Sequence, residues 1–203
     1  MEIGIVVGTF YPINNGHLML AEYAKREYHL DKIWFMPNKI PPHKSTASIE
    51  AMMKHRVEMV KLAIGANPDY VFQPYEVEHT GVSYSYRTLE HFKETYPRDT
   101  FYFIIGADSL FAIESWVKPE RILKACVILA AFRDGKDWEE MHRKISYLNG
   151  KYDSDIRLLH TPNMDISSTD IRKRLRCGES VEGMVPREVA NYIRKQHLFQ
   201  GEA

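Results

Sequence analysis

Hydrophobic and polar positions along the chain follow two alternating patterns. Short apolar stretches rich in β-branched and aromatic residues predict strands at 2–7, 32–36, 70–77, 100–105, 126–131 and 155–160. Between them, apolar residues recur with helical spacing, as at Ile49, Met53, Val57, Val60 and Ile64. The fourth and fifth strands are continuously apolar, as parallel strands buried on both faces are. The pattern predicts an α/β fold: a doubly wound (Rossmann-like), mostly parallel sheet with helices on both faces.

The length of the chain predicts one compact unit. At 203 residues it matches the usual size of a single domain, 1–203, with a C-terminal helical part at about 167–199. The stretch 37–48 contains three prolines and is expected to be a shaped, functional loop. In a doubly wound sheet, ligands bind beyond the carboxyl ends of the strands. Residues that directly follow strands are therefore the first candidates for a site.

Charge and composition narrow the class of partner. Lys plus Arg number 27 and Asp plus Glu number 27, so the chain lacks the positive field that attracts nucleic acid. No stretch approaches the roughly 18 to 20 apolar residues that span a bilayer, and the chain starts directly in a strand without a basic leader. We expect no nucleic-acid partner, no membrane association and a cytoplasmic location. Two cysteines without a CxxC or HExxH pattern predict no metal-ligand set.

The segment after the first strand is a candidate anion site. It reads Gly8-Thr9-Phe10-Tyr11-Pro12-Ile13-Asn14-Asn15-Gly16-His17-Leu18 and opens onto a helix. Free backbone N–H groups and the helix dipole favour anions at such a terminus. Gly16 would let a phosphate approach the backbone, and His17 would touch it. For a Gly-His pair alone, the alternative is a first-turn histidine without a chemical role.

A second candidate segment leaves the last strand and enters another helix. It reads Asp165-Ile166-Ser167-Ser168-Thr169-Asp170-Ile171-Arg172. Serines at a helix start commonly serve only as caps. Here they precede Arg172 on the first turn, so that hydroxyls, backbone N–H groups and a guanidinium converge as a polyphosphate would require.

Both segments resemble motifs of the HxGH nucleotidylyltransferase superfamily, the second its ISSTxIR motif. The resemblance implies that His17 and Arg172 stabilise the reacting phosphate. It also implies an ATP site made of Gly8, Thr9, Phe10, Asn14, Gly16, His17, Gly106, Asp108, Ser167, Ser168 and Arg172. Two positions depart from the pattern, which usually has an acidic residue at Tyr11 and a histidine or threonine at Asn14. A side-chain amide keeps a hydrogen bond to phosphate but not a charge, and neutral donors bind about half as strongly.

Three further segments resemble nicotinate-nucleotide adenylyltransferases. The PPHK segment of that family is similar to Pro37-Asn38-Lys39-Ile40-Pro41-Pro42-His43-Lys44. Its GxDxL motif and tryptophan are similar to Ile104-Ile105-Gly106-Ala107-Asp108-Ser109-Leu110 and Trp116. Its SYTxDTL segment is similar to Ser83-Tyr84-Ser85-Tyr86-Arg87-Thr88-Leu89. A substrate site is implied at Lys44, His43, Ser85, Asp108, Trp116 and Arg133. In it, Trp116 would stack on a pyridine ring and Asp108 would accept from ribose hydroxyls. The alternatives are an exposed Lys44, a Trp116 that is plain core, and an Arg87 that is a surface residue.

The resemblance implies adenylyl transfer from ATP to nicotinate mononucleotide in NAD biosynthesis. The expected partners are ATP and a pyridine mononucleotide, with Mg²⁺ bound mainly through the ATP phosphates. The alternatives are another acceptor, such as nicotinamide mononucleotide or phosphopantetheine, and a relative that binds nucleotide without turning it over. The sequence leaves open the strictness for the acid over the amide and the choice between a monomer and a homo-oligomer.

Overall fold

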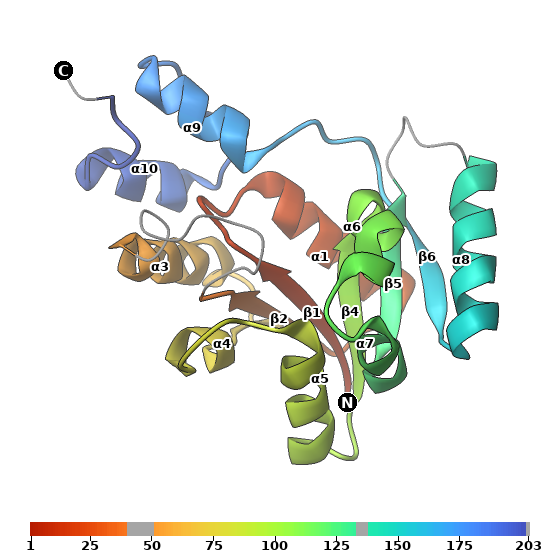
Figure 1. Ribbon diagram of the computed structural model, residues 1–203. Helices are drawn as coiled ribbons and strands as arrows, with labels where there is room; N and C mark the ends of the chain where they lie inside the picture. Colours follow the sequence, from red (N-terminus) through yellow and green to blue (C-terminus); the bar gives the residue numbers. More distant parts are fainter. Residues whose placement is uncertain (40–50, 133–137, 202–203) are drawn as a thin grey trace.

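A six-stranded parallel sheet runs through the middle of the molecule (Figure 1). The computed structural model describes residues 1–39, 51–132 and 138–201. The strands are β1 (Glu2–Gly8), β2 (Lys32–Pro37), β3 (Tyr70–Phe72), β4 (Thr100–Gly106), β5 (Val127–Phe132) and β6 (Ile156–His160). They lie in the order β3-β2-β1-β4-β5-β6, and every neighbouring pair is parallel. This confirms the doubly wound, Rossmann-like fold.

Helices cover both faces of the sheet. They are α1 (Asn15–Glu27), α3 (Met53–Ile64), α4 (Tyr75–Glu78), α5 (Ser85–Thr95), α6 (Ala107–Ala112), the short 3₁₀ helix η1 (Ile113–Ser115), α7 (Pro119–Ala125), α8 (Trp138–Tyr152), α9 (Ser168–Arg176) and α10 (Arg187–Lys195). Successive strand residues point to opposite faces, so β1 sends Ile5 into one core and Val6 into the other. The core with Val6 includes residues of α1, α3, α9 and α10, and the core with Ile5 includes residues of α5, α7 and α8.

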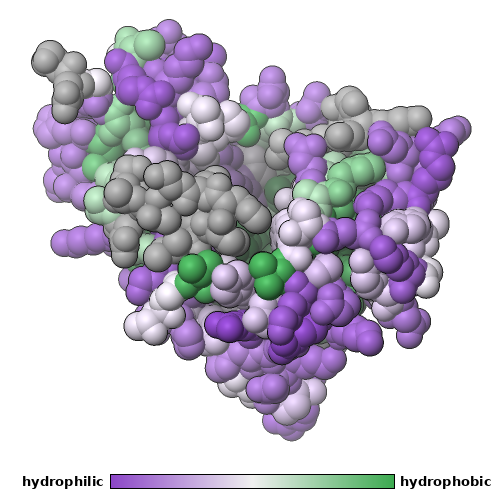
Figure 2. Space-filling model, in the orientation of Figure 1, coloured by the Kyte–Doolittle hydropathy of each residue, from purple (hydrophilic) through white to green (hydrophobic). Residues whose placement is uncertain are grey.

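The face of the molecule drawn in Figure 2 is mostly hydrophilic. On the face drawn in Figure 2, hydrophobic side chains form small separate patches among polar and charged ones. Within the described parts of the chain, none of the helices is long and apolar enough to cross a bilayer.

The third strand is shorter than the sequence pattern predicts. We expected a strand over 70–77, but β3 ends at Phe72 and α4 begins at Tyr75. Pro74 lacks the N–H that a further ladder bond would need, and Oε1 of Gln73 accepts a hydrogen bond from the Tyr75 N–H at 3.1 Å. The helical turn that results carries Glu76 into the protein, where only 4% of the residue is exposed.

The topological switch point of the sheet, where the chain connections turn to opposite faces, lies between β1 and β4. These strands are neighbours, with Val6 paired to Ile104, yet α1 follows β1 onto one face and α6 follows β4 onto the other. The two connections diverge at the carboxyl ends of the strands, which opens a crevice there. Helices α9 and α10 lie toward the same end of the sheet (Figure 1).

Candidate active site

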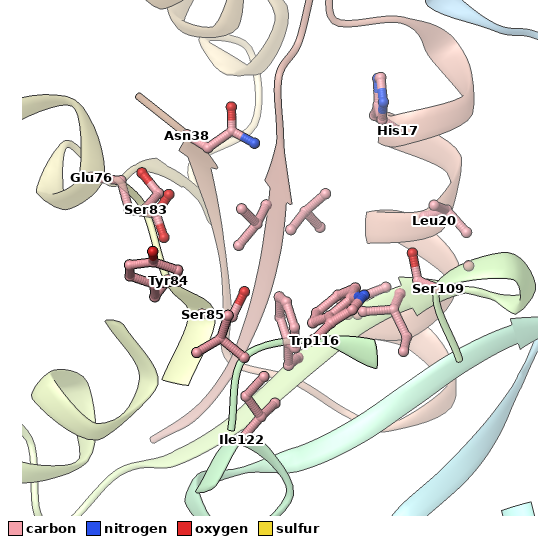
Figure 3. Close-up of a pocket in the computed structure, with 17 residues that line it drawn as sticks. His17, Leu20, Asn38, Glu76, Ser83, Tyr84, Ser85, Ser109, Trp116 and Ile122 are labelled. Carbon is pink, nitrogen blue, oxygen red and sulfur yellow. The ribbon is translucent and has the colours of Figure 1, made fainter. Parts of the chain in front are cut away.

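Two cavities lie beyond the carboxyl ends of β1 and β4, and His17 lines both. The apolar cavity has a volume of about 310 Å³, and its lining includes residues of β1 and β4 together with Ser85 and Trp116 (Figure 3). The polar cavity has a volume of about 670 Å³, and its lining includes Thr9, Phe10, Tyr11, Ser168, Thr169, Arg172 and Arg176. The imidazole therefore stands where the two spaces meet.

The start of α1 fixes the orientation of His17. Asn14 is the N-cap: its Oδ1 accepts from the Gly16 N–H at 2.9 Å and the His17 N–H at 3.3 Å. In return, the Asn14 N–H donates to Nδ1 of His17 at 3.1 Å, which completes a capping box. Because Nδ1 must accept, the ring proton belongs on Nε2. The ring of Phe10, 1% exposed, supports the imidazole edge-on at 5.0 Å between centroids.

The second phosphate-binding candidate contacts the first directly. Asn14 Nδ2 donates to Ser168 Oγ at 3.0 Å, and that hydroxyl donates to the Pro12 carbonyl at 2.8 Å. Ser167 acts as the N-cap of α9, where its Oγ accepts from the Asp170 N–H at 3.1 Å. Two positive helix N-termini, those of α1 and α9, are thereby held side by side at the polar cavity.

Gly16 leaves room for the capping bond of Asn14. A Cβ at this position would lie 3.0 Å from Oδ1 of Asn14 and 3.7 Å from the Ile166 carbonyl. The first contact is tight and the second is ordinary, so the absence of a side chain favours the capping bond in particular. At Gly106, by contrast, a Cβ would meet nothing within 4 Å among the described atoms, since this glycine faces the apolar cavity.

Two arginines on successive turns of α9 line the polar cavity. Arg172 Nη1 donates to the Tyr11 carbonyl at 2.7 Å, and its guanidinium lies 5.0 Å from the centroid of the Tyr11 ring. Burial lowers the pKa of Arg172, with Arg176 acting in the same direction. Arg176 was not predicted as a site residue from the sequence, although its spacing of four residues from Arg172 places both side chains on one face of α9.

A fully buried arginine on α3 joins the loop after β1 to the end of β2. The Arg56 guanidinium donates to the Thr9 carbonyl and to the carbonyl and Oδ1 of Asn38, and the residue is 0% exposed. Burial lowers its pKa to about 10, which leaves it charged at neutral pH. Arg56 also escaped the sequence analysis, because one cation within an amphipathic helix is usually solvated.

Trp116 lies between the core and the apolar cavity. It lines the apolar cavity and packs edge-on against Phe103 of β4, at 6.3 Å between ring centroids. Ser85, the first residue of α5, lines the same cavity. Asp108 is exposed on the first turn of α6, outside the residues that line either cavity. Asn38, Glu76 and Ser83 also line the apolar cavity, and the sequence analysis had not assigned them a role (Figure 3).

Comparison with known proteins identifies the family. A model described as Cytidylyltransferase-like matches residues 5–174. The chain is 40% identical over 198 residues to a probable nicotinate-nucleotide adenylyltransferase of Lachnoclostridium phytofermentans, covering 98% of each protein. It is 35% identical over 199 residues to nicotinate-nucleotide adenylyltransferase of Bacillus subtilis, again over 98% of each. The chain belongs to the nicotinate-nucleotide adenylyltransferase family.

Solved structures agree with this fold. The nicotinic acid mononucleotide adenylyltransferase of Plasmodium falciparum, complexed with NaAD, superposes with a TM-score of 0.80 at 23% identity, covering 98% of this chain and 97% of the other. At this identity the likeness bears on the fold, and it matches the parallel sheet described above. Within this nucleotidyltransferase family, the departures at Tyr11 and Asn14 have structural uses: the Tyr11 ring packs against the Arg172 guanidinium, and Asn14 caps α1 while bonding Ser168.

Three of the implied substrate residues cannot be placed. His43, Lys44 and Arg133 lie outside the described residues. Arg87, for which attraction to a carboxylate and a surface role were both open, is exposed, and it stacks on Tyr84 and Tyr86 at 5.5 and 5.7 Å. Its Nε donates to the Tyr86 hydroxyl at 3.0 Å. In this adenylyltransferase, Arg87 is exposed, and its guanidinium contacts two tyrosine rings.

Proposed function

We propose that the protein transfers the adenylyl group of ATP to nicotinate mononucleotide, giving nicotinate adenine dinucleotide and pyrophosphate in NAD biosynthesis. The observation that carries the proposal is the position of His17 between an apolar and a polar cavity. A reaction that joins two phosphates needs two binding sites meeting at one point, with a donor beside it. The names of the curated relatives support the same substrates.

Each cavity suits one substrate. The polar cavity offers the N-termini of α1 and α9, the hydroxyls of Ser168 and Thr169, and the cations Arg172 and Arg176. These groups match the negative charge and many acceptor oxygens of a triphosphate. The apolar cavity offers the flat face of Trp116 and a glycine floor at Gly106, which match an aromatic ring and its ribose.

The reaction requires positioning more than proton transfer. An oxygen of the acceptor phosphate attacks the α-phosphorus of ATP, a new P–O bond forms, and the bond to the bridging oxygen of the β-phosphate breaks in line. The leaving group is pyrophosphate, and the nucleophile is already an anion, so a general base is not needed. The two sites bring two anions together, and His17 Nε2–H and the Arg172 guanidinium stabilise the charge on the transferring phosphoryl group.

Magnesium fits this site through the substrate and not through a protein cage. Among the described residues, no group of three or more His, Cys, Asp and Glu side chains is arranged to hold a metal ion. Mg²⁺ usually keeps several waters and binds substrate phosphates, where it neutralises their charge. The described lining of the polar cavity, which supplies cations, hydroxyls and backbone N–H groups, fits the phosphates of such a complex.

A panel of acceptors tests the proposal. Purified protein is incubated with ATP, Mg²⁺ and nicotinate mononucleotide, nicotinamide mononucleotide, phosphopantetheine or no acceptor, and pyrophosphate release is followed. We expect the fastest release with nicotinate mononucleotide and none without an acceptor. Equal rates for acid and amide would contradict the acid preference but keep the enzyme class. Release with phosphopantetheine alone would reassign the substrate, and no release with any acceptor would indicate a nucleotide-binding relative.

A further inference from the structure

A buried carboxyl group stands in the wall of the apolar cavity. Glu76, on the short helix α4, lines this cavity although only 4% of the residue is exposed. It lies across the cavity from Trp116 and His17, beside Asn38 and Ser83 (Figure 3). Buried carboxylates are rare unless paired, and the site chemistry described above makes no use of this one.

The hydrogen bonds around Glu76 support its charged form poorly. Thr88 Oγ1–H donates to Glu76 Oε1 at 2.8 Å. Among the described residues, Oε2 has no hydrogen-bond partner. An ionised carboxylate offers about four acceptor positions, and leaving most of them empty in a buried place is costly. Burial accordingly raises the pKa of Glu76, while the hydroxyls of Thr88 and Ser83 oppose this rise.

The proposed acceptor carries a negative charge of its own. The ring of nicotinate mononucleotide bears a carboxylate, and its amide counterpart bears a neutral group at the same place. Among the described residues that line the apolar cavity there is neither lysine nor arginine to offset a second negative charge. A cavity of about 310 Å³ keeps any ring substituent within the range where buried charges interact strongly. An ionised Glu76 would therefore repel the acid and not the amide.

We propose that Glu76 is a specificity-determining residue: its neutral carboxyl group admits the acid mononucleotide, and its ionisation shifts preference toward the amide. This inference rests on the proposed function of the same cavity. It concerns the choice between two acceptors and not the transfer step, which both acceptors share. The ratio of kcat/KM for acid to kcat/KM for amide is the quantity that reports it.

Other ionisable groups lie around Glu76, and the variant Glu76→Gln separates their effects from those of Glu76. Among the described residues, the groups named next do not contribute to the shift in the pKa of Glu76. They are Tyr75, Glu78 and His79 on or beside α4, Tyr84, Arg87 and His91 at or on α5, Lys39 after β2, and His17 across the cavity. Any change of charge at these groups is shared by the wild type and Glu76→Gln, so a difference between the pH profiles of the two proteins belongs to Glu76.

The decisive measurement is the ratio for the wild-type enzyme between pH 5 and 9. Glu76 is neutral below its raised pKa and ionises as pH rises through it. Below the pKa of Glu76 we expect a constant ratio that favours nicotinate mononucleotide. Above this pKa the ratio should fall at least about tenfold, because a close pair of like charges costs more than the 1.4 kcal/mol that corresponds to tenfold. A ratio that stays constant over this range, with both acceptors still reacting, overturns the inference but leaves the proposed function standing.

Three variants assign the pH dependence to this residue. Glu76→Gln keeps the acceptor for Thr88 but cannot ionise, so its ratio should stay at the acid-side value at every pH. Thr88→Val removes a hydrogen bond that favours the ionised form, so the fall should move to higher pH. Glu78→Gln, which changes an exposed carboxylate on the same helix, should behave as wild type.

Two outcomes reject the role of Glu76: an unchanged midpoint in Thr88→Val, or a wild-type profile in a folded Glu76→Gln. If neither acceptor reacts at any pH, the proposed function itself fails.

Discussion

Asn14 Nδ2 donates a hydrogen bond to Ser168 Oγ at 3.0 Å, although the two residues are 154 positions apart in the chain. The bond joins the turn before α1 to the first residue of α9, the two helix starts that face the polar cavity. A site for a triphosphate needs both termini held at a fixed separation, because each supplies only part of the binding. The geometry of the cavity therefore depends on a pair that neither motif reveals alone.

Replacing Asn14 by aspartate tests this pair. Asn14→Asp keeps an N-cap oxygen for Gly16 and His17 but loses the donor to Ser168 and adds a negative charge beside the phosphates. We expect kcat/KM for ATP to fall at least about tenfold, as losing one buried hydrogen bond costs about 1 to 3 kcal/mol. Asn15→Asp is the matched control, since its side chain bonds the Gly183 carbonyl instead. Steady-state kinetics at varied ATP would show equal losses in both variants if the pair is unimportant.

Removing the imidazole at the junction of the cavities should affect turnover. His17→Ala should lower kcat by about two orders of magnitude or more, because loss of one preorganised hydrogen-bond donor at the reacting group slows an enzyme by about this factor. Circular dichroism should show an unchanged fold. His142→Ala, an exposed histidine on α8, serves as the control. Unchanged turnover in His17→Ala would refute the role assigned to this side chain.

The sequence predicted the parts of the site that a local motif contains. His17 and Ser168 could be found because a helix start after a strand fixes both their position and their chemistry within a few residues. Arg56 and Glu76 could not be found, because their burial results from packing between elements distant in the chain. The strand expected over 70–77 was too long for a related reason: its apolar pattern continues past Pro74 into α4. Periodicity thus locates elements, but not the polar groups that tertiary contacts enclose.

Trp116 should contribute to binding of the pyridine acceptor. Trp116→Ala should raise KM for the mononucleotide up to about tenfold, because aromatic stacking contributes about 0.5 to 1.5 kcal/mol. KM for ATP should change little, since Trp116 lines only the apolar cavity. Trp116→Phe should recover part of the loss, and Trp138→Ala, 46% exposed on α8, should match wild type. A larger effect on ATP than on the acceptor would contradict this assignment.

Arg56 should stabilise the fold through the carbonyls it bonds. Arg56→Met leaves the acceptors on Thr9 and Asn38 without their donor, and we expect the free energy of unfolding to fall by about 2 to 4 kcal/mol. Urea unfolding followed by fluorescence measures this change. Lys54→Met, an exposed cation on the same helix, is the control and should stay within about 0.5 kcal/mol of wild type. Equal effects of the two substitutions would mean that the bonds of Arg56 add nothing.

Glu114 should make stability depend on pH in the acid range. Its carboxylate in η1 accepts hydrogen bonds from Lys144 Nζ at 2.8 Å and Lys151 Nζ at 2.7 Å, both on α8. These bonds, with that of the Tyr152 hydroxyl, lower the pKa of Glu114 from its usual 4.5 to about 2. A depressed folded-state pKa means that the carboxylate stabilises the native protein above pH 4.5, and that this contribution is lost as pH falls from 4.5 toward 2.

The variant Glu114→Gln separates this effect from general acid denaturation. We expect its Tm to lie below that of wild type at pH 7, and the gap to shrink steadily as pH falls below 4.5, because protonation gives the wild-type side chain the same neutral state. Glu22→Gln, which breaks an exposed helical pair with Arg26, should change Tm little at any pH. A gap for Glu114→Gln that stays constant from pH 7 to pH 3 would show that packing, and not the charge of the carboxylate, joins η1 to α8.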